Sequence, residues 1–203
     1  MENKDKVILD LCGGTGSWSL PYKNAGYNVR VITLPENNVK TYQSPENVYG
    51  ILAAPPCTMF SFARTNAKKS RDLKEGMECV RACLNIIWKV MEIEQDTIKK
   101  TLPLKFWALE NPYFGFLKNF LGKPAFIFDP WEFSDGYQKR TALWGNFNEP
   151  IKNPTPMTKE AKAKAKTNSY LHTMGNSLEV WDKQARRSIT PQGFAKAFFE
   201  SNQ

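Results

Sequence analysis

The chain has 203 residues, of which 41% are hydrophobic and 24% are charged, and its formal net charge is +8. Such a chain suits one globular domain, and no apolar run approaches the roughly 20 residues that a membrane-spanning helix needs. Residues 1–6 lead directly into an apolar segment without room for a secretory signal, so we expect a cytosolic protein. The positive charge favours a polyanionic partner such as nucleic acid, although solubility alone also explains it.

Strand and helix patterns alternate along the chain. Strands are expected at residues 6–11, 28–34, 39–42, 49–54, 102–109, 125–128 and 140–144. Helices are expected at residues 17–25, 68–100, 113–121, 159–166 and 190–200, the last with Thr190 as N-cap and Pro191 at N1. This alternation predicts an α/β fold: a doubly wound, mostly parallel sheet with helices on both faces, in one domain over residues 1–203.

A glycine-rich turn follows the first strand. Residues 10–16 read Asp-Leu-Cys-Gly-Gly-Thr-Gly, between a predicted strand and a predicted helix. Glycines at such a turn let the backbone approach a ligand closely. The spacing is neither that of a phosphate-binding P-loop nor a complete Gly-x-Gly-x-x-Gly. We expect a ligand site here, and a purely structural turn is the alternative.

Cys57 follows the apolar strand at residues 49–54 and two prolines, Pro55 and Pro56. Neither proline can continue a central strand, because neither donates a ladder hydrogen bond. Cys57 is therefore expected in a stiff loop at the carboxyl end of a strand, where open α/β sheets bind ligands. A thiol held there is a candidate nucleophile, and the alternative is a small buried cysteine in a turn.

Glu110 directly follows the strand expected at residues 102–109 and is itself followed by Asn111 and Pro112. A carboxyl group held beside apolar neighbours at a strand end could deliver a proton to a substrate. The alternative is a surface carboxylate that caps the next helix.

A metal site is not expected. The remaining cysteines are Cys12, Cys79 and Cys83, and there is one histidine, His172. No close CxxC pair is present, so a zinc site would need unusual ligands.

Together these stretches resemble the cytosine-C5 DNA methyltransferase family in its short, phage-type form. Residues 10–16 are similar to the family's S-adenosylmethionine loop, Asp-Leu-Phe-x-Gly-x-Gly, residues 55–61 to its Pro-Cys catalytic loop, and residues 110–112 to its Glu-Asn-Val motif. Residues 137–140 are similar to its Gln-x-Arg-x-Arg motif, and residues 189–199 to the last helix, which packs beside the cofactor. The resemblance implies a Rossmann-like, S-adenosylmethionine-dependent methyltransferase fold.

The resemblance also implies a reaction, methyl transfer from S-adenosyl-L-methionine to C5 of a cytosine in DNA. Cys57 would add to C6, Glu110 would protonate or hydrogen-bond N3, and Arg140 would contact the base carbonyl. A cytosine in duplex DNA must first be flipped out of the stack. The residues expected to line the cofactor site are Asp10, Cys12, Gly14, Gly16, Trp18 and Pro55.

A basic loop at residues 62–72 is expected to close on DNA, and a solvated basic loop is the alternative. Its cationic residues are Arg64, Lys68, Lys69 and Arg71. The resemblance places such a protein in the cytosol of a bacterium or of a phage-infected host.

Several positions depart from the family pattern. Cys12 replaces a Phe that packs against the cofactor, and Trp18 is a candidate substitute, although a core position fits it equally. Glu36 comes two residues later than the acidic residue expected after the second strand. Ala142 stands where a second Arg is expected, which leaves Arg140 or Arg64 to contact the base carbonyl.

Residues 145–171 occupy the place of the family's target-recognition domain and are too short to form an independent domain. We therefore expect relaxed or very short sequence specificity, or a protein partner that supplies recognition.

Three other functions stay open. Residues 111–114 distantly resemble the Asn-Pro-Pro-Tyr/Phe motif of amino-group methyltransferases, which would not need Cys57. A catalytically decayed DNA-binding protein on the same scaffold is the second. The same chemistry on RNA or on a free nucleotide is the third.

Overall fold

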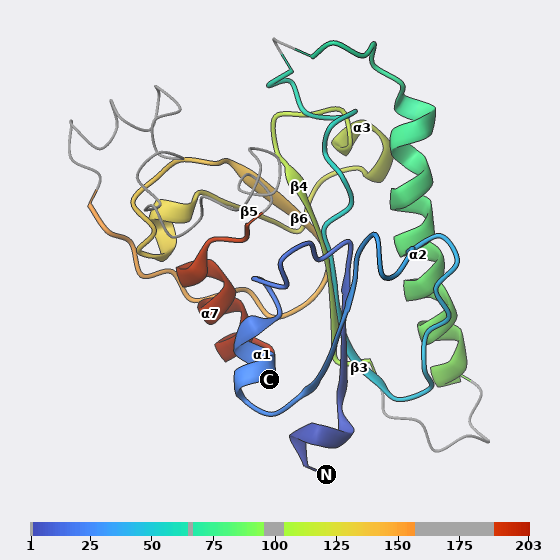
Figure 1. Ribbon diagram of the computed structural model, residues 1–203. Coiled ribbons are helices and arrows are strands. Elements are labelled where there is room, and N and C mark those ends of the chain that lie inside the picture. The colour runs from blue at the N-terminus through green and yellow to red at the C-terminus, as the bar shows by residue number, and fades with distance from the viewer. Residues whose placement is uncertain (1, 65–66, 96–103, 157–188) are drawn as a thin grey trace.

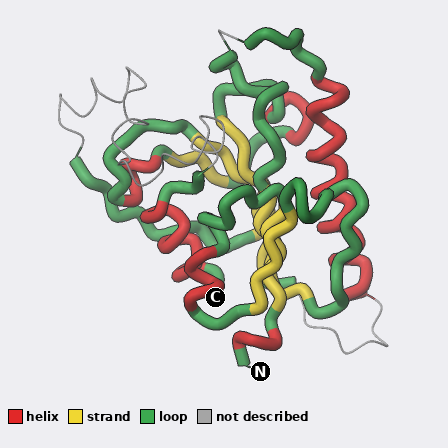
Figure 2. Tube along the Cα trace, viewed as in Figure 1, coloured by secondary structure: helices red, strands yellow, loops and turns green. Residues whose placement is uncertain are grey.

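A mixed six-stranded sheet with the order β2-β1-β3-β4-β6-β5 forms the centre of the protein (Figures 1 and 2). The computed structural model describes residues 2–64, 67–95, 104–156 and 189–203. The strands are β1 (Val7–Leu11), β2 (Asn28–Ile32), β3 (Val48–Ala53), β4 (Phe106–Pro112), β5 (Phe126–Phe128) and β6 (Thr141–Asn146). Strands β1 to β4 pair in parallel, and β6 is antiparallel to both β4 and β5. The sheet is mostly parallel and compatible with a Rossmann-like fold.

Helices cover both faces of this sheet. The long helix α2 (Leu73–Gln95) lies on one face, and α1 (Leu20–Asn24) and α7 (Gln192–Ser201) lie on the other (Figure 1). Shorter elements are η1 (Asn3–Asp5), α3 (Lys118–Leu121) and η2 (Pro130–Phe133). Every residue of β1 is buried, which explains its nearly continuous apolar sequence: a strand covered on both faces has no solvent side.

Aromatic side chains hold α7 against the sheet. Phe194 stacks on Phe128 with ring centroids 3.9 Å apart, and Phe198 meets Phe106 edge-on at 5.7 Å. All four rings are fully or almost fully buried, so they contribute both apolar area and specific ring geometry. The C-terminal helix is therefore part of the core.

The predicted α/β class, the mostly parallel sheet and the helices on both faces are confirmed. Six of the seven predicted strands are present, with ends that shift by a few residues. The predicted strand at residues 39–42 is wrong, because this segment turns instead. Asn38 accepts hydrogen bonds there from Lys40 N through its side chain (3.0 Å) and from Thr41 N through its carbonyl (3.0 Å).

Other predicted boundaries need correction. Helix α2 begins at Leu73, not at residue 68, and its predicted C-terminal end lies outside the described residues. Helix α7 begins at Gln192 with Pro191 at the N-cap, so Thr190 is not the cap. Asp135 Oδ2 instead accepts a hydrogen bond from Gly193 N (2.9 Å) in the first turn. The helix predicted at residues 159–166 lies outside the described residues.

Strand β4 continues through Glu110 to Pro112, three residues beyond its predicted end. Tyr113 N donates to Arg140 O beside β6. Backbone N–H groups point to alternate sides along a strand, so an N–H on residue 112 would point toward β3. Strand β3 pairs with β4 only as far as Leu109. A proline is tolerated at this point because its missing N–H has no strand to bond.

None of the helices in the described part of the chain has the length and apolar character that crossing a membrane requires.

Candidate active site at the carboxyl ends of β1, β3 and β4

Three neighbouring parallel strands bring the predicted motifs to one edge of the sheet. Leu11 pairs with Ala53, and Ala53 pairs with Leu109, so the ends of β1 and β3 and residue Glu110 of β4 lie side by side. The glycine-rich turn follows β1 and the Cys57 loop follows β3. This is the edge at which open α/β sheets bind ligands.

The backbone of the glycine-rich turn is shaped by close approach to Asp10. Cys12, Gly14 and Gly16 all have positive φ angles, of 57°, 54° and 70°. A Cβ atom on Gly13 would lie 2.4 Å from the carboxyl carbon of Asp10, so only glycine fits at that position. The turn therefore wraps around a buried carboxyl group.

Asp10 is fully buried, and burial raises its pKa to about 6 although hydrogen bonds from Ser19 oppose the shift. Ser19 Oγ donates to Asp10 Oδ2 at 2.6 Å. The other carboxyl oxygen, Oδ1, is buried and accepts no hydrogen bond from the described residues. A buried acceptor without a hydrogen bond lowers the stability of the folded protein unless another group pairs with it.

Two further buried polar atoms have no hydrogen-bond partner in the described part of the chain: Thr15 Oγ1 in this turn and Trp18 Nε1 two residues after it. Asp10 Oδ1 and Thr15 Oγ1 both belong to the glycine-rich turn. The residues present therefore fit a ligand with its own hydrogen-bonding groups.

The side chains of Cys12 and Trp18 lie in the core on opposite faces of the sheet. The indole of Trp18 is 2% exposed and packs against Phe194 and Phe198 under α7. The thiol of Cys12 packs toward α2, where a hydrogen bond with Cys83 lowers the Cys12 pKa. Glu36 is exposed in the turn after β2.

The Cys57 loop is fixed at both ends of a tight turn. Cys57 O accepts hydrogen bonds from Phe60 N and Ser61 N, both at 2.9 Å. Before the turn, Pro55 O accepts a buried hydrogen bond from Asn111 Nδ2 at 3.0 Å. Because Asn111 follows Glu110 directly, this bond ties the loop of the candidate nucleophile to the strand of the candidate acid.

A second connection follows the turn. Phe62 N donates to Phe114 O, and Phe116 N donates to Phe60 O, each at 3.0 Å. Ser61 and Gly115 form an antiparallel bridge between these bonds. The loop after β3 and the segment after β4 thus run as a short ladder, so Cys57 and Glu110 are positioned by one connected piece of backbone.

Arg71 holds the same loop from the side of α2. Its guanidinium donates to Met59 O and to Ser61 O (3.0 Å) and lies 4.8 Å from the ring centre of Phe116. Arg71 is predicted to contact DNA, and the structure shows in addition that Nη1 and Nη2 each donate to a backbone carbonyl of the Cys57 loop. Sequence reasoning missed this contact because it joins residues ten or more apart.

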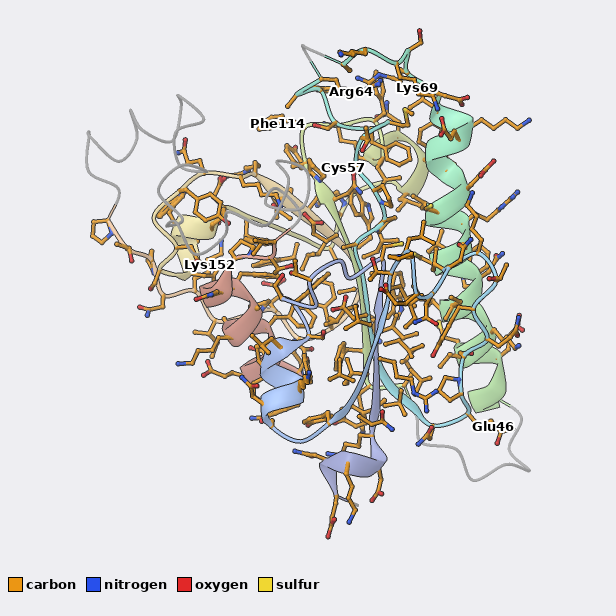
Figure 3. All side chains as sticks on the ribbon, in the orientation of Figure 1. Glu46, Cys57, Arg64, Lys69, Phe114 and Lys152 are labelled. Atoms are coloured by element: carbon orange, nitrogen blue, oxygen red, sulfur yellow. The ribbon has the colours of Figure 1, made fainter. Side chains whose placement is uncertain are left out.

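The other predicted DNA-contacting residues lie on the surface at the same end of the molecule. Arg64 donates to Lys69 O (2.7 Å), and Lys69 forms an exposed ion pair with Glu75. Lys68 is exposed. Figure 3 shows Arg64 and Lys69 toward the end of the molecule that also carries Cys57.

The structure places Lys139, which the sequence analysis did not single out, beside Glu110. Lys139 Nζ lies 4.0 Å from Glu110 Oε1, and both side chains are largely buried. Arg140 Nη1 instead pairs with Asp129 Oδ2 at 3.0 Å. Sequence reasoning missed Lys139 because its position depends on the pairing of β4 with β6.

Two surface cavities lie away from this edge. One, of about 360 Å³, lies between residues 39–44 and α2, and the other, of about 290 Å³, lies between α2, α3 and β6. Neither is lined by Cys57, Glu110 or the glycine-rich turn. The candidate site is identified by its chemistry.

Replacing Asp10 with Asn should stabilise the protein near neutral pH. The folded protein binds the Asp10 proton more tightly than the unfolded chain, so wild-type stability falls as pH rises from about 4 to about 6 and stays lower above it. Asp10→Asn keeps an acceptor for Ser19 and removes the ionisation. We expect a gain on the order of 3 kcal/mol at pH 7 that disappears near pH 4.

Urea unfolding of both proteins between pH 4 and pH 7 measures this difference directly. A gain that does not change with pH would contradict the account of Asp10.

Comparison with known proteins does not assign this site. No protein-family model matches the chain, and no curated protein sequence matches it. The functional conclusion rests on the geometry of the strand ends.

Proposed function

We propose that this protein is an S-adenosylmethionine-dependent DNA cytosine-C5 methyltransferase in which Cys57 is the nucleophile and Glu110 acts at N3 of the base. One observation supports this most strongly: a thiol and a carboxyl group lie at the ends of adjacent parallel strands, and the buried Asn111–Pro55 hydrogen bond ties their segments together. Catalysis of this kind requires both groups to be held in a fixed relation to one ring.

The chemistry explains why both groups are needed. Cytosine C5 is a poor nucleophile until a thiolate adds to C6 and makes C5 enamine-like. Cys57 supplies the thiolate, and Glu110 stabilises the adduct by donating a proton or a hydrogen bond at N3. After methylation at C5, loss of the C5 proton drives the C6–sulfur bond to break and releases Cys57.

S-adenosylmethionine, when bound, supplies a methyl group on a positively charged sulfur. The residues that would hold it are those of the glycine-rich turn, with Asp10 Oδ1 and Thr15 Oγ1 as its hydrogen-bonding partners. The mostly parallel sheet, with the turn after its first strand, is compatible with this assignment.

Exposed aromatic rings support a nucleic acid as the substrate. Phe62 and Phe114 are 50% and 58% exposed, although they lie on the short ladder beside the Cys57 turn. Figure 3 shows Phe114 close to the same end of the molecule as Arg64 and Lys69. Rings with nearby cations are the arrangement that stacks on unpaired bases and binds phosphates.

The amino-group alternative is less well supported by the geometry. Asn111 would have to present its amide oxygen to an exocyclic amine, but the residue is 1% exposed, and its amide nitrogen is held by Pro55 O. Pro112, the next residue of that motif, is part of β4.

Cys57→Ala should abolish methyl transfer. Wild-type protein is incubated with duplex DNA and S-adenosylmethionine carrying a labelled methyl group, and label is expected in 5-methylcytosine. Loss of the nucleophile removes the step that activates C5, so the variant should transfer no measurable label. Cys79→Ala, which changes a half-buried thiol on α2, is the matched control and should retain activity.

The other outcomes separate the alternatives. Label that survives Cys57→Ala contradicts the proposal and favours an amino-group acceptor. Label in RNA or in a free nucleotide, but not in DNA, keeps the chemistry and changes the substrate. A wild-type protein that binds DNA but not the cofactor would be a decayed enzyme.

Phe114→Ala should weaken DNA binding without affecting cofactor binding. Stacking of a base on an aromatic ring contributes roughly 1–3 kcal/mol, which corresponds to about a fivefold to 150-fold rise in Kd. Fluorescence anisotropy with DNA containing an unpaired cytosine measures the change.

The matched control is Trp88→Ala, which removes a 52% exposed ring from α2 and should leave Kd unchanged. Equal affinities of wild type and Phe114→Ala would show that this ring does not contact DNA.

A further inference from the structure

The pairing of β4 with β6 decides which basic side chain shares a face of the sheet with Glu110. Glu110 pairs with Leu143, and Pro112 pairs with Thr141. The hydrogen bond from Tyr113 N to Arg140 O continues this ladder by one residue. Directly paired residues project to the same face, and successive residues alternate. Residue 139 therefore lies on the face of Glu110, and residues 140 and 142 lie on the other face.

The side-chain contacts agree with this alternation. Lys139 Nζ lies 4.0 Å from Glu110 Oε1, with side chains 30% and 20% exposed. Arg140 turns to the opposite face, where its guanidinium pairs with Asp129 and lies 6.0 Å from the ring centre of Tyr113. Ala142 is fully buried and carries no charge. Of these three positions, only 139 places a cation beside the candidate acid.

We infer that Lys139 is the positioning residue for Glu110, an inference that rests on the proposed methyltransferase function. The Lys139 ammonium group holds one carboxyl oxygen and leaves the other directed at the base. A partly buried carboxyl group without such a partner could adopt several rotamers, which would weaken its action at N3. Lys139 thus fills the position that neither Arg140 nor Ala142 can fill.

A lysine near a DNA-binding edge could instead bind a phosphate, and the two roles make different predictions. A phosphate-binding lysine contributes to affinity, and its removal reduces the slope of log affinity against log salt by about one. A lysine that acts through Glu110 contributes to the rate at saturating DNA and leaves that slope unchanged.

The test is a kinetic double-mutant cycle on Lys139→Gln and Glu110→Gln, read as the single-turnover rate of labelled methyl transfer at saturating DNA and cofactor. We expect Lys139→Gln to reduce the rate at least tenfold, and Lys139→Arg to restore most of it. Once Glu110 is replaced, the further change Lys139→Gln should have little effect, because residues that act as a unit are not additive.

Arg140→Gln gives the control cycle. This variant removes a cation that is paired with Asp129. Any change that it causes in the single-turnover rate should therefore be the same with Glu or with Gln at position 110. Circular dichroism of each variant checks that the fold is retained.

The outcomes separate the two claims. Suppose that wild type transfers label. The role of Lys139 is then overturned, and the proposed function stands, if Lys139→Gln is as fast as wild type, if its rate reduction multiplies that of Glu110→Gln in the double mutant, or if it reduces the salt slope of DNA binding. If wild type transfers no label to cytosine, the proposed function is overturned and the role of Lys139 with it.

Discussion

The candidate site depends on one buried hydrogen bond, from Asn111 Nδ2 to Pro55 O. Strands β3 and β4 are parallel neighbours only as far as Ala53 and Leu109, and beyond that point no sheet pairing holds their ends together. The Asn111 side chain takes over at this position, and the backbone bonds of residues 60–62 to residues 114–116 extend the connection. The prolines before Cys57 offer no backbone N–H to a neighbouring strand, and the Asn111 side chain supplies a bond between the two segments at this point. The relation between Cys57 and Glu110 follows from this arrangement.

In the glycine-rich turn, a buried group lowers the stability of the folded protein. A fully buried carboxyl group, with one oxygen that no described residue pairs with, destabilises the folded protein at neutral pH, and an amide in its place would not carry that charge. Ser19 offsets the cost only in part, and Gly13 is confined to glycine by the same carboxyl group. A buried group that lowers stability and keeps an unpaired atom at a strand end is characteristic of a binding site.

Much of this architecture could be predicted from local sequence, and the rest could not, for identifiable reasons. Apolar runs predicted β1 and β3, because a strand buried on both faces is apolar throughout. Pro55 and Pro56 predicted the Cys57 loop, because their missing backbone donors end the strand. The turn at residues 39–42 depended on the Asn38 side chain, which competed with strand formation. The continuation of β4 through Pro112 and the placement of Lys139 beside Glu110 depended on β6, a partner some thirty residues away in the chain. The structural role of Arg71 likewise required knowledge of the folded loop.

The most direct test of the central claim is to trap the bond between Cys57 and a cytosine. In DNA that carries 5-fluorocytosine, C5 has no proton to lose after methylation, so the C6–sulfur bond cannot be released. Denaturing electrophoresis and peptide mass spectrometry would then locate the adduct. We predict a covalent protein–DNA complex that requires S-adenosylmethionine, maps to Cys57 and is absent from Cys57→Ser. A protein that methylates ordinary cytosine in DNA but forms no such adduct, or forms it at another residue, would contradict the assignment of Cys57 as the nucleophile.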